Sequence, residues 1–185
     1  MKCITYVLLL CTFFAGLLNA ETLNEPSSFN DLMSSYQLGP GDQIRIIVFR
    51  EPDLSIETKL TDAGSIIFPF LGEISVSGLT VGALKEKITQ GLSGRLIIDP
   101  IVSVSILAYR EFFVNGQVKK PGAFPYFPGL TVQKAISMAE GFTERASQSS
   151  VKIIREKDIS YKAIDAELNA VVYPGDVVIV EESFF

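Results

Sequence analysis

The side chains in this sequence that could carry acid-base chemistry are carboxylates. The 185 residues include no histidine, and both cysteines, Cys3 and Cys11, lie within the first twenty residues. A Ser-His-Asp triad would lack its base, and the chain after residue 20 has no thiol nucleophile. Glycoside hydrolysis needs two carboxylates across one bond. The candidate pairs are Glu51 with Asp53 and Glu181 with Glu182.

Turn positions explain several of the remaining carboxylates. Asp42 and Asp176 each follow a Pro-Gly pair, and Asp62 lies two residues before Gly64. An aspartate in a turn usually accepts hydrogen bonds from nearby backbone N–H groups, and neighbouring glutamates are usually solvated. We therefore predict a protein that is not an enzyme and uses neither a metal ion nor a cofactor.

Glycine and proline mark the turns between the predicted elements, because proline restricts φ and glycine accepts φ > 0. Pro-Gly-Asp precedes a hydrophobic strand twice, and Gly-Leu-Thr-Val opens a predicted helix twice. The two motifs occur in opposite order in the two halves, so a simple tandem repeat is not supported. The predicted turn residues are Gly39, Pro40, Gly41, Asp42, Asp62, Gly64, Gly116, Pro121, Gly122, Pro174, Gly175 and Asp176.

Residues 36–109 are predicted to form one β-rich unit. Residues 44–49 are β-prone, residues 102–106 alternate Val or Ile with Ser, and residues 58–69 are predicted to form a hairpin that turns at Asp62-Ala63-Gly64. Thr80 can cap a helix that ends before Gly94. The apolar face of that helix comprises Val81, Leu84, Ile88 and Leu92.

Residues 110–185 are predicted to form a second small unit, with the boundary near residues 108–111. Strands are predicted at residues 112–114, 123–127, 151–155 and 177–180. Thr131 can cap a helix whose inward residues are Val132, Ala135, Ile136 and Ala139, with Gly141 as its stop. Residues 164–171 fit either a short helix or a loop. The fold class is therefore α+β, in two small β-rich units.

Aromatic side chains are better candidates for a functional role than the carboxylates, because sugar rings stack on aromatic faces. Phe124, Tyr126 and Phe127 lie in a Pro-rich stretch, residues 121–128, which favours a surface position. Phe112 and Phe113 are further candidates, as are the terminal Phe184 and Phe185. The alternative is that these aromatic residues belong to the core or to a subunit interface.

The first twenty residues have the pattern of a secretory signal peptide. Lys2 precedes the apolar run from Tyr6 to Leu18, which is shorter than the roughly 20 residues of a membrane-spanning helix, and cleavage is expected between Ala20 and Glu21. Residues 21–35 are predicted to be a flexible leader. The protein is thus expected to be exported, and the resemblance described below implies the periplasm, with the outer-membrane surface as a further site. Cys11 lies inside the apolar run, which disfavours a lipid anchor.

Charge excludes one class of partner. Without Lys2, the only basic residue of the signal, 15 basic and 21 acidic residues remain, a net charge of −6. An acidic chain without a Lys/Arg cluster has no electrostatic means of holding a phosphate backbone. We therefore expect no nucleic-acid partner.

Several of these motifs, in this order, resemble the polysaccharide biosynthesis/export domain. They are Tyr36-Gln37-Leu38-Gly39-Pro40-Gly41-Asp42, Thr61-Asp62-Ala63-Gly64-Ser65-Ile66, Phe68-Pro69-Phe70-Leu71-Gly72-Glu73-Ile74, Gly78-Leu79-Thr80 and Asp99-Pro100 before Val102-Ser103-Val104. Val114-Asn115-Gly116-Gln117-Val118, Pro121-Gly122-Ala123-Phe124 and Val151-Lys152-Ile153-Ile154-Arg155 resemble a soluble-ligand-binding β-grasp (SLBB) domain. Ala139-Glu140-Gly141 departs from the Ala-Gly-Gly that is frequent there.

The resemblance implies the outer-membrane polysaccharide export (OPX, Wza-like) family, with a signal peptide at 1–20, a leader at 21–35, an export domain at 36–109 and one SLBB domain at 110–185. It implies a periplasmic subunit that forms homo-oligomeric rings, guides polysaccharide and works with an inner-membrane polysaccharide co-polymerase. The C-terminal membrane helix and lipidated cysteine of some members are not recognised here. A separate outer-membrane pore or barrel protein is then expected as a partner.

Two other functions remain open. A monomeric or dimeric periplasmic glycan-binding or glycan-sensing module would bind one saccharide and form no ring. A polysaccharide hydrolase or lyase would show turnover that a carboxylate substitution abolishes.

Overall fold

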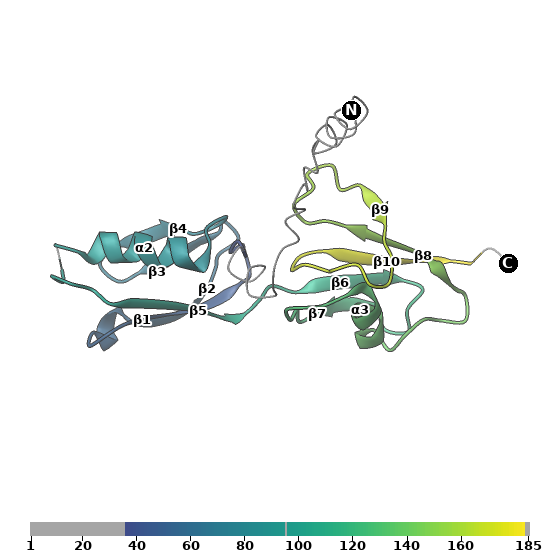
Figure 1. Cartoon of the computed structure of the whole chain (residues 1–185), viewed down its shortest axis with the longest axis horizontal. Helices are drawn as coiled ribbons and strands as arrows, with labels where there is room; N and C mark the ends of the chain where they lie inside the picture. Colours follow the sequence, from purple (N-terminus) through teal and green to yellow (C-terminus); the bar gives the residue numbers. More distant parts are fainter. Residues whose placement is uncertain (1–35, 95, 184–185) are drawn as a thin grey trace, which may run out of the picture.

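The computed structural model describes residues 36–94 and 96–183, which form two β-rich units arranged end to end (Figure 1). The predicted signal peptide, the Ala20–Glu21 cleavage site, the leader and Phe184–Phe185 lie outside the described residues. Among the described helices, none has the length and apolar character required to cross a membrane. Two hydrophobic cores occupy the two units, and ten strands and two α-helices surround them, which confirms the α+β class.

The first unit is built on a three-stranded antiparallel sheet with the order β2-β1-β5. β1 alternates strictly, so that Ile44, Ile46 and Val48 are buried while the residues between them are exposed. The 3-10 helix η1 (Pro52–Leu54) connects β1 to β2. The strands are β1 (Gln43–Val48), β2 (Ile56–Lys59) and β5 (Val102–Ala108).

The predicted hairpin at residues 58–69 is wrong in its pairing. The turn after Thr61 forms, with the Gly64 N–H donating to the Thr61 carbonyl over 2.8 Å. However, β2 pairs with β1, and β3 (Ser65–Phe68) pairs with β4 (Gly72–Ser75) in a separate two-stranded sheet. Two strands joined by a tight turn need not pair when each finds a partner elsewhere in the chain.

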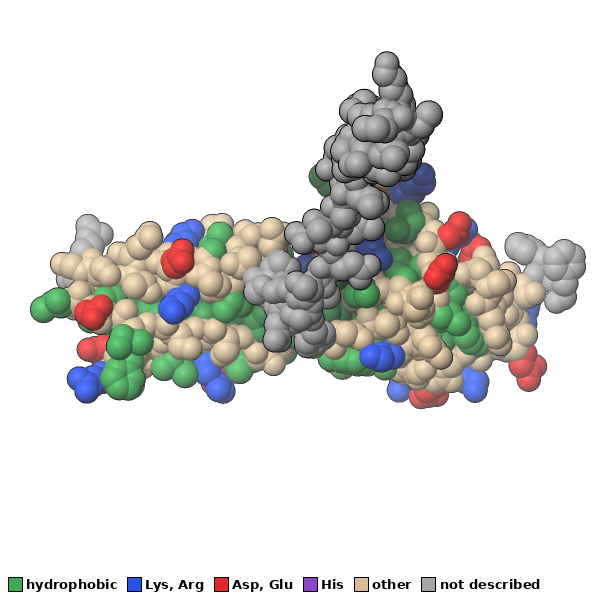
Figure 2. Space-filling model, viewed as in Figure 1, with side chains coloured by type: hydrophobic (Ala, Val, Ile, Leu, Met, Phe, Trp, Pro, Cys, Tyr) green, Lys and Arg blue, Asp and Glu red, His purple; other side chains and the backbone are tan. Residues whose placement is uncertain are grey.

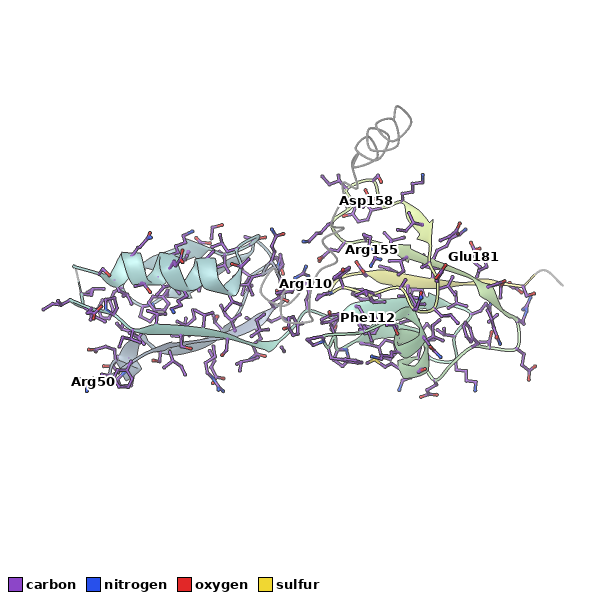
Figure 3. The ribbon with its side chains drawn as sticks, in the orientation of Figure 1. Arg50, Arg110, Phe112, Arg155, Asp158 and Glu181 are labelled. Carbon is purple, nitrogen blue, oxygen red and sulfur yellow. The ribbon has the colours of Figure 1, made fainter. Side chains whose placement is uncertain are left out.

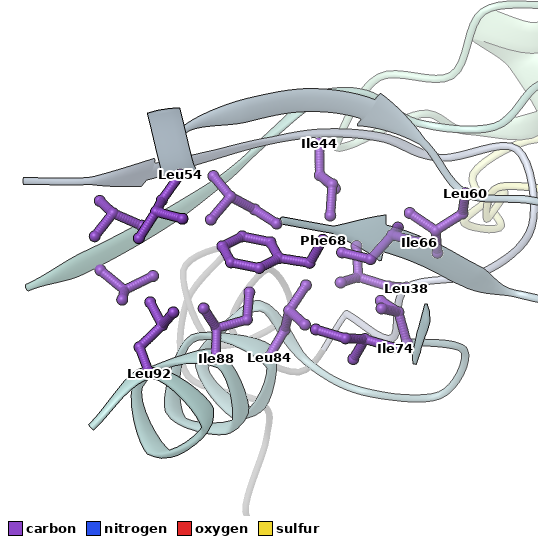
Figure 4. Packing of buried hydrophobic residues seen from close by; sticks show 14 residues of the cluster. Leu38, Ile44, Leu54, Leu60, Ile66, Phe68, Ile74, Leu84, Ile88 and Leu92 are labelled. Atoms are coloured by element: carbon purple, nitrogen blue, oxygen red, sulfur yellow. The ribbon is translucent and has the colours of Figure 1, made fainter. Parts of the chain in front are cut away.

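Helix α2 (Val81–Leu92) covers the core of the first unit. Thr80 caps it, because its side-chain oxygen accepts a hydrogen bond from the Ala83 N–H over 3.1 Å. Figure 4 shows Phe68 of β3 between the sheet and the apolar face of the helix. That face carries the predicted residues: Leu84, Ile88 and Leu92 are fully buried and Val81 is partly buried.

The second unit contains a five-stranded sheet with the order β7-β6-β10-β8-β9. β10 lies in the middle, parallel to β6 and antiparallel to β8. The C-terminal segment of the described chain thus supplies the central strand. The strands are β6 (Phe112–Gly116), β7 (Gly122–Phe124), β8 (Ala146–Ile154), β9 (Ala163–Asp165) and β10 (Val177–Glu182).

Helix α3 (Val132–Met138) packs its apolar face into the second core as predicted. Thr131 caps it through a 3.4 Å hydrogen bond from the Lys134 N–H, and Gly141 follows its end with φ +87°. Residues 164–171, predicted as a helix or a loop, begin instead with strand β9 and continue as an irregular segment. β9 pairs with the preceding strand β8, so this segment begins as the second strand of a hairpin.

Candidate functional site

The two Pro-Gly-Asp motifs of the sequence form similar turns. The Asp42 N–H donates to the Gly39 carbonyl over 3.1 Å, and the Asp176 N–H donates to the Tyr173 carbonyl over 3.2 Å. The glycine of each motif has a positive φ, +89° and +82°, which glycine adopts without strain. Both aspartates are buried, and each therefore needs hydrogen-bond donors from the surrounding chain.

Asp42 receives those donors from both sides of the junction between the units. Its Oδ2 accepts hydrogen bonds from the Gly39 N–H (2.8 Å), the Tyr36 hydroxyl (2.7 Å) and Arg110 Nη1 (3.1 Å). Its Oδ1 accepts one from the Arg110 N–H over 2.8 Å. These four hydrogen bonds offset the cost of removing the Asp42 carboxylate from water.

Asp176 has an equivalent set of donors in the second unit. Its Oδ2 accepts hydrogen bonds from the Tyr173 N–H (2.9 Å) and Arg155 Nη1 (2.6 Å), and its Oδ1 accepts one from the Glu156 N–H (3.3 Å). Each buried aspartate thus binds the N–H three residues before it, one arginine side chain and a further backbone N–H.

Arg110 connects the two turns. Its guanidinium donates to Asp42 over 3.1 Å. It also donates to both carboxylate oxygens of Glu156, over distances of 2.5 to 3.0 Å. The Glu156 N–H in turn binds Asp176, so hydrogen bonds run continuously from one turn to the other. Figure 3 shows Arg110 at the junction of the two units. We refer to Tyr36, Asp42, Arg110, Glu156 and Asp176 as the junction network.

The glycines of the two turns make room for this network. A Cβ on Gly39 would lie 2.7 Å from Arg110 Nη1, and a Cβ on Gly175 would lie 2.3 Å from the Glu156 carboxyl carbon. Three tyrosine rings continue the contact: Tyr36 packs edge-on against Tyr109 at 5.0 Å, and Tyr109 against Tyr126 at 5.3 Å. The junction is therefore closely packed around its charges.

Electrostatics in the junction network favours fixed charges over proton transfer. Burial raises the pKa of Tyr36, and its hydrogen bond to Asp42 raises it further. Burial lowers the pKa of Arg110, but the hydrogen bond to Glu156 and the nearby charges outweigh this, and its pKa is raised. Near neutral pH the phenol is neutral and the guanidinium is charged, so the network is suited to holding two units together.

The predicted contact residues Phe124, Tyr126 and Phe127 lie in different environments. Phe124 packs on the buried Phe112 with ring centroids 5.9 Å apart. Tyr126 is half-buried beside Tyr109, and burial raises its pKa to about 12. Phe127 is 41% exposed. Contact with a glycan stays a prediction, and of these three side chains Phe127 has the largest accessible surface.

The other predicted turn glycines lie where the backbone requires them. Gly64 has φ +70° and leaves no room for a Cβ beside Ser77, while Gly122 after Pro121 has φ +155°. Gly116 has φ +84°, and a Cβ there would lie 2.1 Å from the carbonyl oxygen of Val180 in the central strand. Asp62 is exposed in its turn, and its side chain makes no hydrogen bond or ion pair with the described residues.

The acidic pairs considered for hydrolysis lie in exposed surroundings. Glu181 accepts 2.5 Å hydrogen bonds from Lys152 and Ser150, which lower its pKa, while Glu182 pairs with Arg145. Glu51 and Asp53 are exposed around η1. Within residues 36–94 and 96–183, no cluster of three or more acidic, histidine or cysteine side chains could hold a metal ion.

Two open grooves complete the candidate surfaces. One, of about 710 Å³, lies between residues 148–151 of β8, residues 165–169 and Gln133. The other, of about 530 Å³, lies over the end of β1 and the start of β2, and Phe49, Arg50 and Glu57 line it. Residues 148–150 lie between the pairs Ala146–Glu182 and Val151–Val180, where the register of β8 and β10 shifts.

Sequence reasoning did not single out Arg110, Glu156, Phe49 or Arg50. Arg110 could have been found from its position, because it is a charged residue inside the predicted boundary at residues 108–111. The alternation of β1 was a signal for Phe49, because an inward Val48 places the next residue on the other face. No local pattern indicated that Glu156 would be the partner of Arg110, because the two residues are 46 positions apart in the sequence.

Both units of this chain match families of known proteins. Residues 30–107 match the family described as "Polysaccharide biosynthesis/export protein", and residues 112–161 match the SLBB domain. The chain therefore contains the two domains that its motifs indicated, a combination consistent with the outer-membrane polysaccharide export family. Neither family description names an enzyme.

Characterised relatives have related names. The chain is 28% identical to the EPS I polysaccharide export outer membrane protein EpsA of Ralstonia nicotianae, over 80% of this chain and 47% of that protein. It is 34% identical to the exopolysaccharide production protein ExoF of Rhizobium meliloti, over 57% of this chain and 28% of ExoF. The chain thus spans less than half the length of these relatives.

Proposed function

We propose that this protein is a non-catalytic, periplasmic subunit of a machine that exports exopolysaccharide or capsular polysaccharide. The observation that carries the proposal is the ordered succession of an export-domain match and an SLBB match, each falling on one of the two structural units. We assign residues 36–109 to the export domain and residues 110–185 to the SLBB domain. The names of the relatives, an outer-membrane export protein and an exopolysaccharide production protein, support an envelope location.

The junction network supports a role as a building block. A subunit of a conduit must hold its domains at a fixed angle so that successive copies meet in the same way. In this chain Arg110 and the tyrosine rings link the units through buried and half-buried contacts. We propose that copies associate head to tail into a closed ring around the polysaccharide, a heterologous arrangement.

The proposed partners follow from this role. They are the polysaccharide itself, an inner-membrane polysaccharide co-polymerase and a separate outer-membrane pore or barrel protein. Guidance of a moving polymer requires weak contacts that exchange quickly, because a tight site would stall the chain. The protein then needs no catalytic group.

The decisive experiment measures the mass of the mature protein by light scattering, alone and with the periplasmic part of the co-polymerase. A ring-sized or partner-induced oligomer is expected. Deletion of the gene should also abolish polymer at the cell surface, and the intact gene should restore it. A monomer that ignores the co-polymerase, in cells that still secrete polymer after deletion, would overturn the proposal.

A monomeric glycan-binding module is the second candidate, and one observation favours it. The groove beside β8 presents the amides of Gln133, Gln148 and Asn169, for which the described part of the chain shows no side-chain hydrogen bond. Free amides suit sugar hydroxyls. This function predicts saccharide binding without any change in mass.

A further inference from the structure

The outer face of the first sheet carries apolar side chains at the end of β1. β1 directs Ile44, Ile46 and Val48 into the core, so Ile47 and the following Phe49 lie on the opposite face. Ile47 is 46% exposed and Phe49 is 58% exposed. Polar residues are usual on a solvated sheet face, so an exposed aromatic ring beside an exposed isoleucine calls for an explanation.

Charged side chains surround this apolar surface. The Arg50 guanidinium lies 5.2 Å from the centre of the Phe49 ring, and no ion pair with Arg50 occurs among the described residues. Arg45 and Glu57 form a 2.6 Å ion pair across β1 and β2. Figure 3 shows Arg50 at the end of the first unit farthest from Arg110.

The backbone of Arg50 is strained. Its φ is +64°, in the left-handed region that residues other than glycine rarely adopt. Such strain persists where the surrounding structure imposes it, and it concentrates at binding sites. Here it accompanies the placement of the Arg50 side chain over the exposed ring.

These residues line one open groove. Its volume of about 530 Å³ falls in the range of small-ligand sites, roughly 300–1,000 Å³. Two arginines and two glutamates line it, so the charges of the lining balance. Figure 2 shows hydrophobic and basic side chains together on the lower edge of this end of the molecule. A groove with an apolar floor, planar polar groups and no net charge suits an uncharged sugar better than an ion.

We propose that this groove is a contact site for an uncharged pyranose segment of the exported polysaccharide, a proposal that rests on the function above. The apolar face of one sugar ring stacks on Phe49 and Ile47. Its hydroxyls donate to Glu57 or Glu51 and accept from Arg50. One exposed ring in an open groove gives a weak site, with a dissociation constant on the order of 1 mM, which a moving polymer leaves easily.

Residue-resolved NMR of the mature protein tests this site. The probes are cellohexaose, isomaltohexaose and neutral oligosaccharides released from the polymer that the producing cells secrete, each at millimolar concentration. Shifts of backbone amides within residues 45–57 are expected with at least one probe. Phe49→Ala should weaken binding about tenfold, while Phe70→Ala, which removes another exposed phenylalanine outside the groove, should leave it unchanged.

Three NMR results would overturn the site. They are no shift at residues 45–57 with any probe, unchanged binding in Phe49→Ala, and shifts confined to the groove at residues 148–169. A fall in molecular mass with Phe49→Ala would assign this face to a contact between copies and would equally overturn it. Because ring formation and secretion are measured separately, loss of this site alone leaves the proposed export function intact.

Discussion

Arg110 binds the carboxylate of Asp42 with both its backbone N–H and its side chain. Its N–H donates to Oδ1 over 2.8 Å and its Nη1 donates to Oδ2 over 3.1 Å. Since the side chain also binds Glu156 of the second unit, the position of the first turn and the position of the second unit depend on the same guanidinium. A change at Arg110 therefore acts on both units.

Arg110→Met tests the energetic weight of this contact. Methionine keeps much of the apolar stem but leaves the buried Asp42 without its cation, and we expect a loss of about 2–4 kcal/mol in the free energy of unfolding, measured by urea denaturation. Arg45→Met is the matched control, because Arg45 and Glu57 form an exposed ion pair that contributes less than about 1 kcal/mol. Equal effects of the two substitutions would contradict a structural role for the junction.

Asp176 should be as important to the second unit as Asp42 is to the first. Asp176→Ala leaves the Arg155 side chain and two backbone N–H groups without their shared acceptor, and should cost about 2–4 kcal/mol. Asp62→Ala removes an exposed turn aspartate and should change stability by less than about 1 kcal/mol. Thermal unfolding of the two variants in parallel checks the difference, and a neutral Asp176→Ala would be incompatible with the donor set described for Asp176.

Two glycines with similar backbone angles separate strain from steric overlap. Gly116 and Gly72 have φ of +84° and +73°, but a Cβ on Gly116 would lie 2.1 Å from the Val180 carbonyl while a Cβ on Gly72 would meet nothing within 4 Å. Gly72→Ala should therefore cost only the backbone strain, about 1–2 kcal/mol. Gly116→Ala must also displace the central strand and should prevent stable folding of the second unit. Circular dichroism and denaturation of both variants measure this, and similar stabilities would argue against the parallel pairing of β6 and β10.

The hydroxyl of Tyr36 gives the junction a pH dependence on the alkaline side. The folded pKa of Tyr36 is raised above its ordinary value of 10.0 by burial and by Asp42. Its contribution to stability is therefore complete below pH 10 and is lost as pH rises beyond that value, where the unfolded chain ionises first. Tyr36→Phe should be less stable than the wild type near pH 7 by about 1–3 kcal/mol, since a hydrogen bond to a carboxylate is lost.

The difference between wild type and Tyr36→Phe should then shrink above pH 10. Urea denaturation at pH 7, 9 and 11 is the measurement, with the pH values chosen on either side of the ordinary pKa. Tyr161→Phe, at an exposed tyrosine, is the control and should show no such convergence. A constant difference at all three pH values would mean that Tyr36 does not donate to Asp42.

Local patterns predicted the helices well because neighbouring residues determine them. Thr80 and Thr131 cap α2 and α3, and the inward residues Leu84, Ile88 and Ala135 follow from spacing alone. The strand partners could not be obtained in this way. A turn between β2 and β3 is visible in the sequence, but the choice of β1 and β4 as partners depends on surfaces formed by distant segments.

In the candidate sites, too, local features could be predicted from the sequence and contacts between distant residues could not. Pro-Gly-Asp at residues 40–42 and 174–176 was recognisable as a turn, because proline and glycine act locally. The approach of the two turns to Arg110 and Glu156 depends on how the units pack, and no short pattern encodes it. Phe112, considered as a surface aromatic, proved to be fully buried, whereas Phe49, which directly follows β1, is exposed.

The central position of β10 sets an order on the assembly of the chain. β10 follows the other four strands of its sheet along the chain, yet both β6 and β8 depend on it for pairing. The strands and α2 of the first unit all precede residue 109, so that core can close without the later strands. The second sheet cannot close until β10 is in place, and before that β6 and β8 are unpaired along the edges that β10 covers. In this interval a holdase chaperone would bind the second unit in preference to the first.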